Sequence, residues 1–147
     1  MLTTIEPRSL HRPAEPAMPP LAGHLLCIDD NPVNGLLIQE FFRLRMGLQV
    51  RLAGSGLSGL AMASAERPLA VLLDLVLPDI HGLEVLARLR ALPALHDIPV
   101  ALVTSEASEA ELALARRLGA AHHWAKPLDL SSLDLQLVDL LSDQTPT

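Results

Sequence analysis

Residues 69–82 read LAVLLDLVLPDIHG, an apolar run that is interrupted by one carboxylate, Asp74, and then continues into a turn. A run this short and this apolar is typical of a strand buried on both faces in the middle of a parallel sheet. A lone Asp at the exit of such a strand is costly to desolvate unless it is paired or used. Taken by itself, Asp74 is better explained as a turn residue or a helix N-cap, so its role depends on how the other strands end.

The composition limits the class of protein. The chain has 147 residues, which suits one domain with a core large enough to fold unaided. A formal charge of −6 and an aromatic content of 2% argue against a nucleic-acid-binding surface. No apolar run reaches the roughly 18 residues of a membrane span, and no signal-peptide pattern is present. The single cysteine, Cys27, lies within an apolar run, which predicts a buried thiol in a reducing compartment, so we expect a cytoplasmic protein.

Strand-like and helix-like segments alternate between two tails. Residues 1–22 are rich in proline and predict a flexible tail, residues 23–142 form the folded domain, and residues 143–147 are a second tail. Five strands are predicted at 24–28, 49–53, 69–73, 99–103 and 121–125, and five helices at 32–46, 55–65, 83–91, 108–118 and 131–141. This alternation predicts a doubly wound α/β fold, a parallel sheet with helices on both faces.

Two of these segments allow finer predictions. The strand at 49–53 is the least apolar and is expected at an edge of the sheet. In the first helix, apolar residues recur at helical spacing at Leu36, Leu37, Phe41 and Leu44.

Polar residues follow four of the five predicted strands. They are Asp29 and Asp30 after the first, Asp74 after the third, Thr104 after the fourth and Lys126 after the fifth. The carboxyl ends of parallel strands meet at one edge, where ligands bind in such sheets. Three crowded carboxylates favour a hard cation, and Mg²⁺ is the usual one beside phosphate. One carboxylate could then accept a phosphoryl group, with the lysine and the hydroxyl contacting its oxygens.

A glycine-rich motif suggests a competing function. Residues 54–59 read GSGLSG, which fits the G-x-G-x-x-G fingerprint of dinucleotide-binding domains, with Asp74 in the place of the ribose-binding acid. That interpretation leaves Asp29, Asp30, Thr104 and Lys126 without a role. Small residues that allow a tight turn and close packing of the helix on the sheet explain the motif better.

The sequence resembles the receiver domain of two-component response regulators, the CheY-like family. The matching segments are IDDNPVN (28–34), VLLDLVLPDIHGLEVL (71–86), LVTSEA (102–107) and AKP (125–127), and the intervals between the strand-end residues match as well. The resemblance covers residues 23–142 and implies a flavodoxin-like sheet with strand order 2-1-3-4-5.

The resemblance also implies a role for each strand-end residue. Asp74 would be the phosphoacceptor, Thr104 the switch hydroxyl and Lys126 the residue that binds the phosphoryl group, with a cis bond to Pro127. Mg²⁺ would be held by Asp29, Asp30, Asp74 and the backbone carbonyl of Val76.

Partners and output are implied in the same way. The phosphoryl donor in this family is a phosphohistidine on a sensor histidine kinase or a histidine phosphotransfer protein, and small phosphodonors such as acetyl phosphate are accepted too. Such a domain catalyses only its own phosphorylation and dephosphorylation, so we do not expect an enzyme acting on other substrates. We expect an apparently stand-alone module that signals through protein contacts, without nucleic acid or membrane.

The output surface is where this sequence departs from the family pattern. His123 stands where an aromatic residue is usual, with Trp124 next, and His81 replaces an acid common before the glycine of the loop after the phosphoacceptor. The helical spacing predicts that Leu112 and Leu135 lie outside the buried faces of their helices, with Leu114 on the buried side. We therefore expect a partner or homodimer face that includes His123 or Trp124, Leu112 and Leu135.

Two alternatives remain from the sequence. One is a degenerate receiver that acts as a phosphorylation-independent scaffold, which His123 keeps open. The other is an enzyme: a dinucleotide-dependent one, or a phosphatase with an aspartyl nucleophile, although Val76 stands where that phosphatase family has a second acid.

Overall fold

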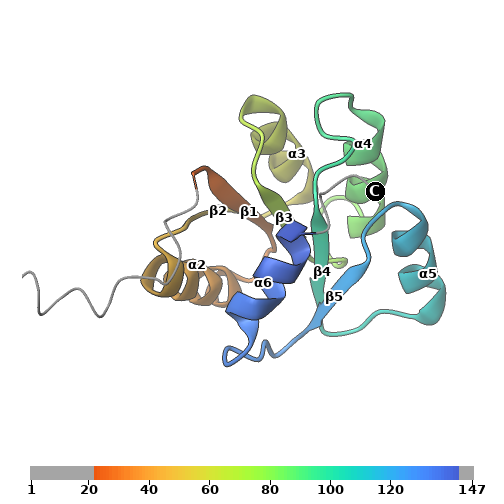
Figure 1. The fold of residues 1–147 in the computed structure, drawn as a ribbon. Coiled ribbons are helices and arrows are strands. Elements are labelled where there is room, and N and C mark those ends of the chain that lie inside the picture. Colours follow the sequence, from red (N-terminus) through yellow and green to blue (C-terminus); the bar gives the residue numbers. More distant parts are fainter. Residues whose placement is uncertain (1–21, 143–147) are drawn as a thin grey trace, which may run out of the picture.

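The computed structural model describes residues 22–142, which form one α/β domain (Figure 1). Its parallel strands are β1 (His24–Ile28), β2 (Gln49–Ala53), β3 (Ala70–Leu73), β4 (Val100–Thr104) and β5 (His122–Ala125). The strand order is β2-β1-β3-β4-β5, as predicted, with β2 at an edge. The helices are α2 (Pro32–Met46), α3 (Gly56–Ala65), α4 (Gly82–Ala91), α5 (Glu109–Arg117) and α6 (Leu133–Ser142). Apart from Ala22, the predicted tails lie outside the described residues.

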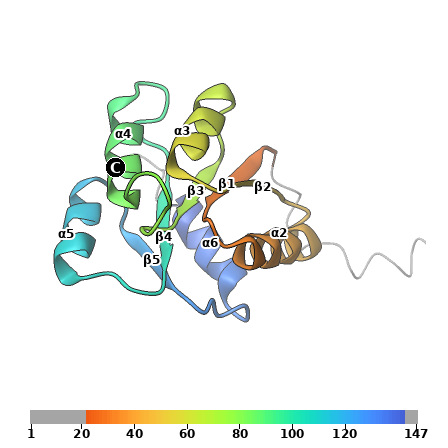
Figure 2. The same ribbon diagram turned by 180° about the vertical axis from the view of Figure 1, so that it is seen from behind.

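The helices form two layers, one on each face of the sheet (Figures 1 and 2). Successive side chains of a strand point to opposite faces, so each strand contributes to two cores. In β1, Leu25 and Cys27 pack with α2 and α6, whereas Leu26 and Ile28 pack with α3, α4 and α5. Because the sheet is covered on both sides, β1, β3 and β4 consist entirely of buried residues.

Helix α2 begins where predicted but buries a different stripe of residues. Asn31 caps it by accepting hydrogen bonds from the backbone N–H groups of residues 33 and 34, and Pro32 occupies the first turn. The buried residues are Gly35, Ile38 and Phe42, whereas the predicted apolar stripe is largely exposed at Leu36, Leu37 and Leu44. Both sets have helical spacing, and contact with β1 and β2 decides which one is buried.

The glycine motif at 54–59 has a packing role, as the sequence suggested. A Cβ at Gly59 would lie 2.4 Å from Cδ1 of Ile28, and a Cβ at Gly56 would lie 2.7 Å from Cγ1 of Ile80. The carboxylate of Asp79 accepts hydrogen bonds from the backbone N–H groups of Gly56 and Leu57 at the start of α3. The helix end that a dinucleotide phosphate would need is therefore already occupied by a carboxylate.

The output residues are placed partly as expected. Leu135 is 66% exposed, but Leu112 packs against the core and Leu114 is the exposed one, so the predicted buried face of α5 was wrong. Trp124 is 3% exposed and packs on the α2–α6 side of the sheet, whereas His123 is exposed. Strand alternation permits only one of these two neighbours to face solvent, and here it is His123.

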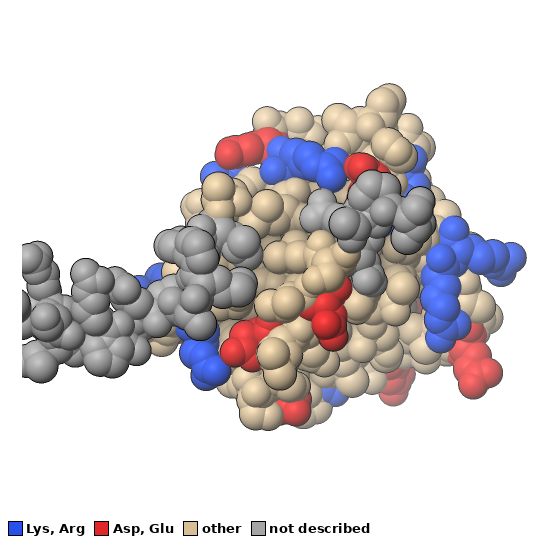
Figure 3. Space-filling view, viewed as in Figure 1, with Lys and Arg blue, Asp and Glu red and all other residues tan. Residues whose placement is uncertain are grey.

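The surface seen in Figure 3 carries charges of both signs. Acidic side chains lie over α6, which holds Asp134 and Asp139, and basic ones over α5, which ends with Arg116 and Arg117. Within residues 22–142, none of the helices has the length and apolar character needed to cross a membrane.

Candidate functional site

The strand-end residues come together at one edge of the sheet. The backbone N–H of Asp74 donates to the carbonyl of Ile28 at the end of β1, over 3.0 Å, and that of Lys126 donates to the carbonyl of Thr104 at the end of β4, over 3.2 Å. These hydrogen bonds continue the parallel pairing of β1 with β3 and of β4 with β5. The sheet register therefore aligns residues that are far apart in the sequence. The bond between Lys126 and Pro127 is cis, as predicted.

Lys126 bridges two carboxylates. Its Nζ lies 2.8 Å from Oδ2 of Asp29 and 2.9 Å from Oδ2 of Asp74. All three side chains are largely buried, at 15%, 3% and 8% exposure. Burial lowers the pKa of Lys126, but its close contacts with the carboxylates of Asp29 and Asp74 outweigh burial, so the pKa is raised above the usual value. The lysine is therefore held as a fixed positive charge beside Asp74.

A third carboxylate, that of Asp30, joins the two that contact Lys126. Asp29, Asp30 and Asp74 offer oxygen atoms that all lie within 4.8 Å of one another. Oδ1 of Asp29 accepts a hydrogen bond from the backbone N–H of Asn31 at 2.8 Å. Its buried Oδ2 forms the ion pair with Lys126 but has no partner in hydrogen-bond geometry among the described residues. The cluster thus has negative charge in excess and oxygen ligands only, so its chemistry fits a hard divalent cation such as Mg²⁺.

The loop after β3 is folded tightly against Asp74. Oδ1 of Asp74 accepts from the backbone N–H of Val76 at 3.2 Å, and the N–H of Gly82 donates to the carbonyl of Leu75 at 2.8 Å. A Cβ at Gly82 would lie 2.3 Å from the backbone oxygen of Asp74. Only glycine allows this close approach. The side chain of Val76 is 70% exposed, so the resemblance assigns a role only to its backbone.

Asp79 fixes the middle of the same loop. Its carboxylate accepts hydrogen bonds from three backbone N–H groups, those of Gly56, Leu57 and Ile80, each at 2.8 Å. The hydrogen bond from Leu57 contributes most, and together these bonds lower the pKa of Asp79 to about 2. The sequence predicted only a turn here, because the main partners of Asp79 belong to another helix and leave no local signal.

Thr104, the last residue of β4, is buried, with 1% exposure. Its hydroxyl donates to the backbone carbonyl of Glu106 at 3.3 Å, within the loop that leads from β4 to α5. The sequence did not predict this partner. In this structure the hydroxyl is thus engaged with the backbone of Glu106.

Cys27 lies in the same sheet but offers no reactive thiol. It is 2% exposed, as predicted, and burial, followed by the negative charge of Asp29, raises its pKa to about 12. A thiol held in this neutral form is a packing group.

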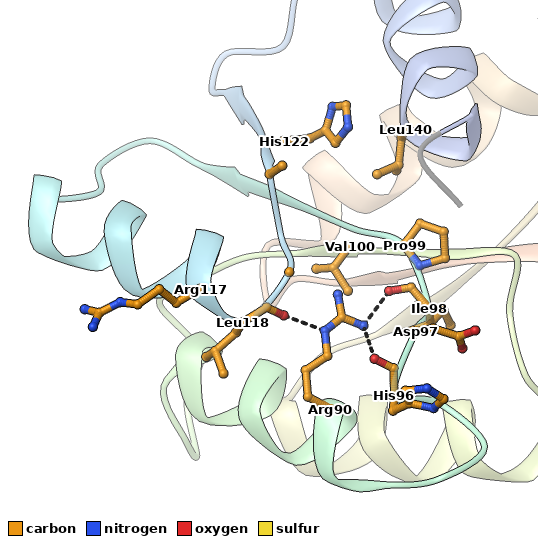
Figure 4. A pocket seen from close by; sticks show the side chains of 12 residues that line it. Arg90, His96, Asp97, Ile98, Pro99, Val100, Arg117, Leu118, His122 and Leu140 are labelled. Atoms are coloured by element: carbon orange, nitrogen blue, oxygen red, sulfur yellow. Dashed lines mark hydrogen bonds between the residues drawn. The ribbon is translucent and has the colours of Figure 1, made fainter. Parts of the chain in front are cut away.

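A separate cavity of about 400 Å³ lies at the amino ends of β4 and β5 (Figure 4). Asp74 follows the carboxyl end of β3, so it lies at the other end of this parallel sheet. The guanidinium of Arg90 reaches into it and donates hydrogen bonds to the backbone carbonyls of His96, Ile98 and Leu118. These bonds tie the end of α4 to the start of β4 and the end of α5. The role of Arg90 is therefore structural.

Known proteins share both the sequence pattern and the fold. A family model described as response regulator receiver domain matches residues 25–138. Sporulation initiation phosphotransferase F of Bacillus subtilis is 32% identical over 109 residues, covering 74% of this chain and 86% of that protein. Protein PilH of Pseudomonas aeruginosa is 31% identical over 109 residues, covering 74% and 89%.

Solved structures of response regulators have the same fold as this chain. A putative response regulator from Chloroflexus aurantiacus superposes with a TM-score of 0.75 at 26% identity, covering 85% of this chain and 99% of that one. A CheY-like receiver domain protein from Methanospirillum hungatei has a TM-score of 0.72 at 26% identity, covering 83% and 95%. With these matches and the strand-end residues in place, the chain belongs to the response regulator receiver domain family of two-component signalling.

Proposed function

We propose that this receiver takes a phosphoryl group onto Asp74 from a phosphohistidine on a sensor histidine kinase or a histidine phosphotransfer protein. The observation that carries the proposal is the position of Asp74, whose carboxylate shares Lys126 with Asp29 inside a cluster of three acids. The ammonium group of Lys126, 2.9 Å from this carboxylate, supplies positive charge that would offset the charge of an incoming phosphoryl group.

The transfer is a single displacement at phosphorus. One oxygen of Asp74 forms the new bond, the bond between phosphorus and the donor's imidazole nitrogen breaks, and its electron pair stays on the imidazole. Lys126 would contact the transferred oxygens, and the backbone N–H of Val76 orients the carboxylate. Asp29, Asp30, Asp74 and the backbone carbonyl of Val76 would hold Mg²⁺. When bound, the ion supplies positive charge that offsets the charge of the carboxylates and of the phosphoryl group.

Exposed apolar side chains near these acids fit a protein as the donor. Leu36, which is 58% exposed, lines a cavity of about 300 Å³ together with Asp29 and Asp30. Val33, in the first turn of the same helix, and Val76, two residues after Asp74, are each 70% exposed. A protein that delivers its imidazole to Asp74 would cover such side chains, as the centres of protein interfaces do.

The output is proposed to be a contact with a downstream protein or a second copy of the chain. His123 and Leu135 are exposed and remain candidates for that contact, whereas the buried Trp124 and the half-buried Leu112 do not. We propose no enzymatic activity beyond phosphorylation and dephosphorylation of the domain itself. The proposed donors and the unpaired thiol of Cys27 fit a reducing cytoplasm.

The test is incubation of the full chain with acetyl phosphate and Mg²⁺, followed by intact-mass measurement. We expect a gain of one phosphate that is lost in Asp74→Asn and in excess chelator. Asp139→Asn, which removes an exposed acid of α6, is the matched control and should be phosphorylated as the natural chain is. A natural chain that gains no phosphate would contradict the proposal and favour the phosphorylation-independent scaffold.

A further inference from the structure

A histidine and a glutamate connect the loop after the phosphoacceptor with helix α5. His81 is the N-cap of α4, and its Nδ1 accepts a hydrogen bond from the backbone N–H of Leu83 at 3.0 Å. Its Nε2 lies 3.2 Å from Oε2 of Glu111. Because Nδ1 accepts, the hydrogen-bond network assigns the proton of the neutral ring to Nε2, which donates to the carboxylate. The imidazole therefore makes two hydrogen bonds of fixed direction.

Glu111 uses its other oxygen to start α5. Its Oε1 accepts from the backbone N–H of Ser108 at 2.9 Å, and the hydroxyl of Ser108 accepts from the backbone N–H of Glu111 at 3.1 Å. This reciprocal pair is a capping box. The contact between His81 and Glu111, here called the bridge, thus joins the amino end of α4 to the amino end of α5.

The bridge lies between the two loops that carry the chemistry. Residues 75–81 lead from Asp74 to His81, and residues 105–108 lead from Thr104 to Ser108. Side chains of both loops, together with His123, line a cavity of about 710 Å³ that the bridging residues also line. Residues 105–108 consequently have space into which they can move, and the bridge is a contact that holds their far end.

We propose that the bridge positions residues 105–108 for the unphosphorylated state and so lowers the rate at which Asp74 is phosphorylated. This inference rests on the proposed function. For the Thr104 hydroxyl to contact a phosphoryl group on Asp74, it must leave the carbonyl of Glu106, to which it donates here. A contact that stabilises the present position of that loop disfavours the alternative by the same free energy. His81 and Glu111 are thus positioning residues, which act through the loop and not on the phosphorus.

Two variants remove the bridge while keeping the caps. His81→Asn retains an N-cap for α4 but is too short to reach Glu111. Glu111→Gln keeps the length and an oxygen for Ser108, but its amide presents a donor to the N–H of His81. We expect each variant to be phosphorylated by acetyl phosphate and Mg²⁺ about two- to five-fold faster than the natural chain, the effect of one partly exposed hydrogen-bonded pair.

A double variant and a rescue variant distinguish loss of the bridge from a general loosening of the fold. The double variant should be no faster than the faster single variant, because both changes remove one contact. His81→Gln, whose amide can donate to Glu111, should return the rate toward that of the natural chain. Glu84→Gln is the control: Glu84 lies in the first turn of α4, and within residues 22–142 its side chain pairs with Arg88 alone. Unchanged rates in both single variants, or single effects that multiply in the double, would overturn the proposal.

Hydrogen exchange of the unphosphorylated protein keeps this test independent of the proposed function. If the natural chain accepts no phosphate, the proposed function fails, but the bridge still predicts faster amide exchange in residues 105–108 of both variants than in the natural chain and in Glu84→Gln. Equal exchange in all four proteins would refute the positioning role.

Discussion

Replacing Asp30 by Asn is expected to stabilise the protein when divalent cations are absent and to weaken its response to Mg²⁺. Asp30 is the exposed member of the acid cluster, and its side chain has no hydrogen-bond or ion-pair partner within residues 22–142. Lys126 contacts Asp29 and Asp74, so the third carboxylate adds charge that no contact within the described residues offsets. Removing that charge while keeping the side-chain shape isolates its electrostatic cost.

The magnitude follows from the spacing of the acids. Two unit negative charges 4.8 Å apart repel by about 3.5 kcal/mol at an effective dielectric constant of about 20, and by about 1 kcal/mol in water. Asp30 is exposed, and attraction to Lys126 offsets part of the repulsion, so the lower end applies. We expect about 1 kcal/mol of added stability in chelator, which corresponds to a rise in Tm of about 4 °C.

In Mg²⁺ the natural chain should become more stable than Asp30→Asn, the reverse of their order in chelator. A ligand that binds only the folded state adds RT ln(1 + [L]/Kd), about 2.7 kcal/mol when its concentration is about 100 times Kd. The natural chain gains this term, whereas Asp30→Asn binds Mg²⁺ more weakly and gains less. Urea unfolding in chelator and in Mg²⁺ measures both effects, with Asp139→Asn as a charge-matched control. If Asp30→Asn in chelator is no more stable than that control, or if Mg²⁺ stabilises the two variants equally, then Asp30 neither repels the other acids nor binds the ion.

Three further changes test the framework of the site, each by urea unfolding. A carboxylate with a lowered pKa stabilises the fold above its ordinary pKa of 3.8, and this contribution disappears as the pH falls toward 2. Asp79→Asn should therefore flatten the pH dependence of stability in that window. An unchanged slope would show that the backbone hydrogen bonds to Asp79 do not stabilise its charged form. Gly82→Ala places a Cβ against the backbone oxygen of Asp74 and should cost at least about 2 kcal/mol, whereas Gly54→Ala, which meets nothing within 4 Å, should be nearly neutral. Arg90→Met leaves three backbone carbonyls without their donor and should cost about 1–3 kcal/mol; a neutral result would show that water replaces it.

The residues that carry the proposed chemistry could be predicted because they follow strands. A buried strand leaves a clear apolar run in the sequence, and a parallel sheet places every carboxyl end at the same edge. Asp29, Asp74, Thr104 and Lys126 could therefore be grouped before any contact was known. The position of β2 at an edge followed from its polarity in the same way.

The helices were harder to interpret than the strands. Helical spacing in α2 is satisfied by Leu36, Leu37 and Leu44 as well as by Ile38 and Phe42, and only packing on the sheet selects the second set. The spacing of apolar residues within one helix does not specify which face packs against the neighbouring elements. The same ambiguity in α5 explains why Leu114 was predicted to be buried and Leu112 exposed, whereas the structure shows the opposite.

The sequence by itself determined the fold class, the strand order implied by the resemblance, and which residues meet at the edge of the sheet. Tertiary structure alone decided how that edge is held: Asp79 on the start of α3, Thr104 on the carbonyl of Glu106, and His81 on Glu111. The physical reason is one of range. Periodicity and strand ends are properties of consecutive residues, whereas most of these contacts join loops that become neighbours only when the sheet has formed.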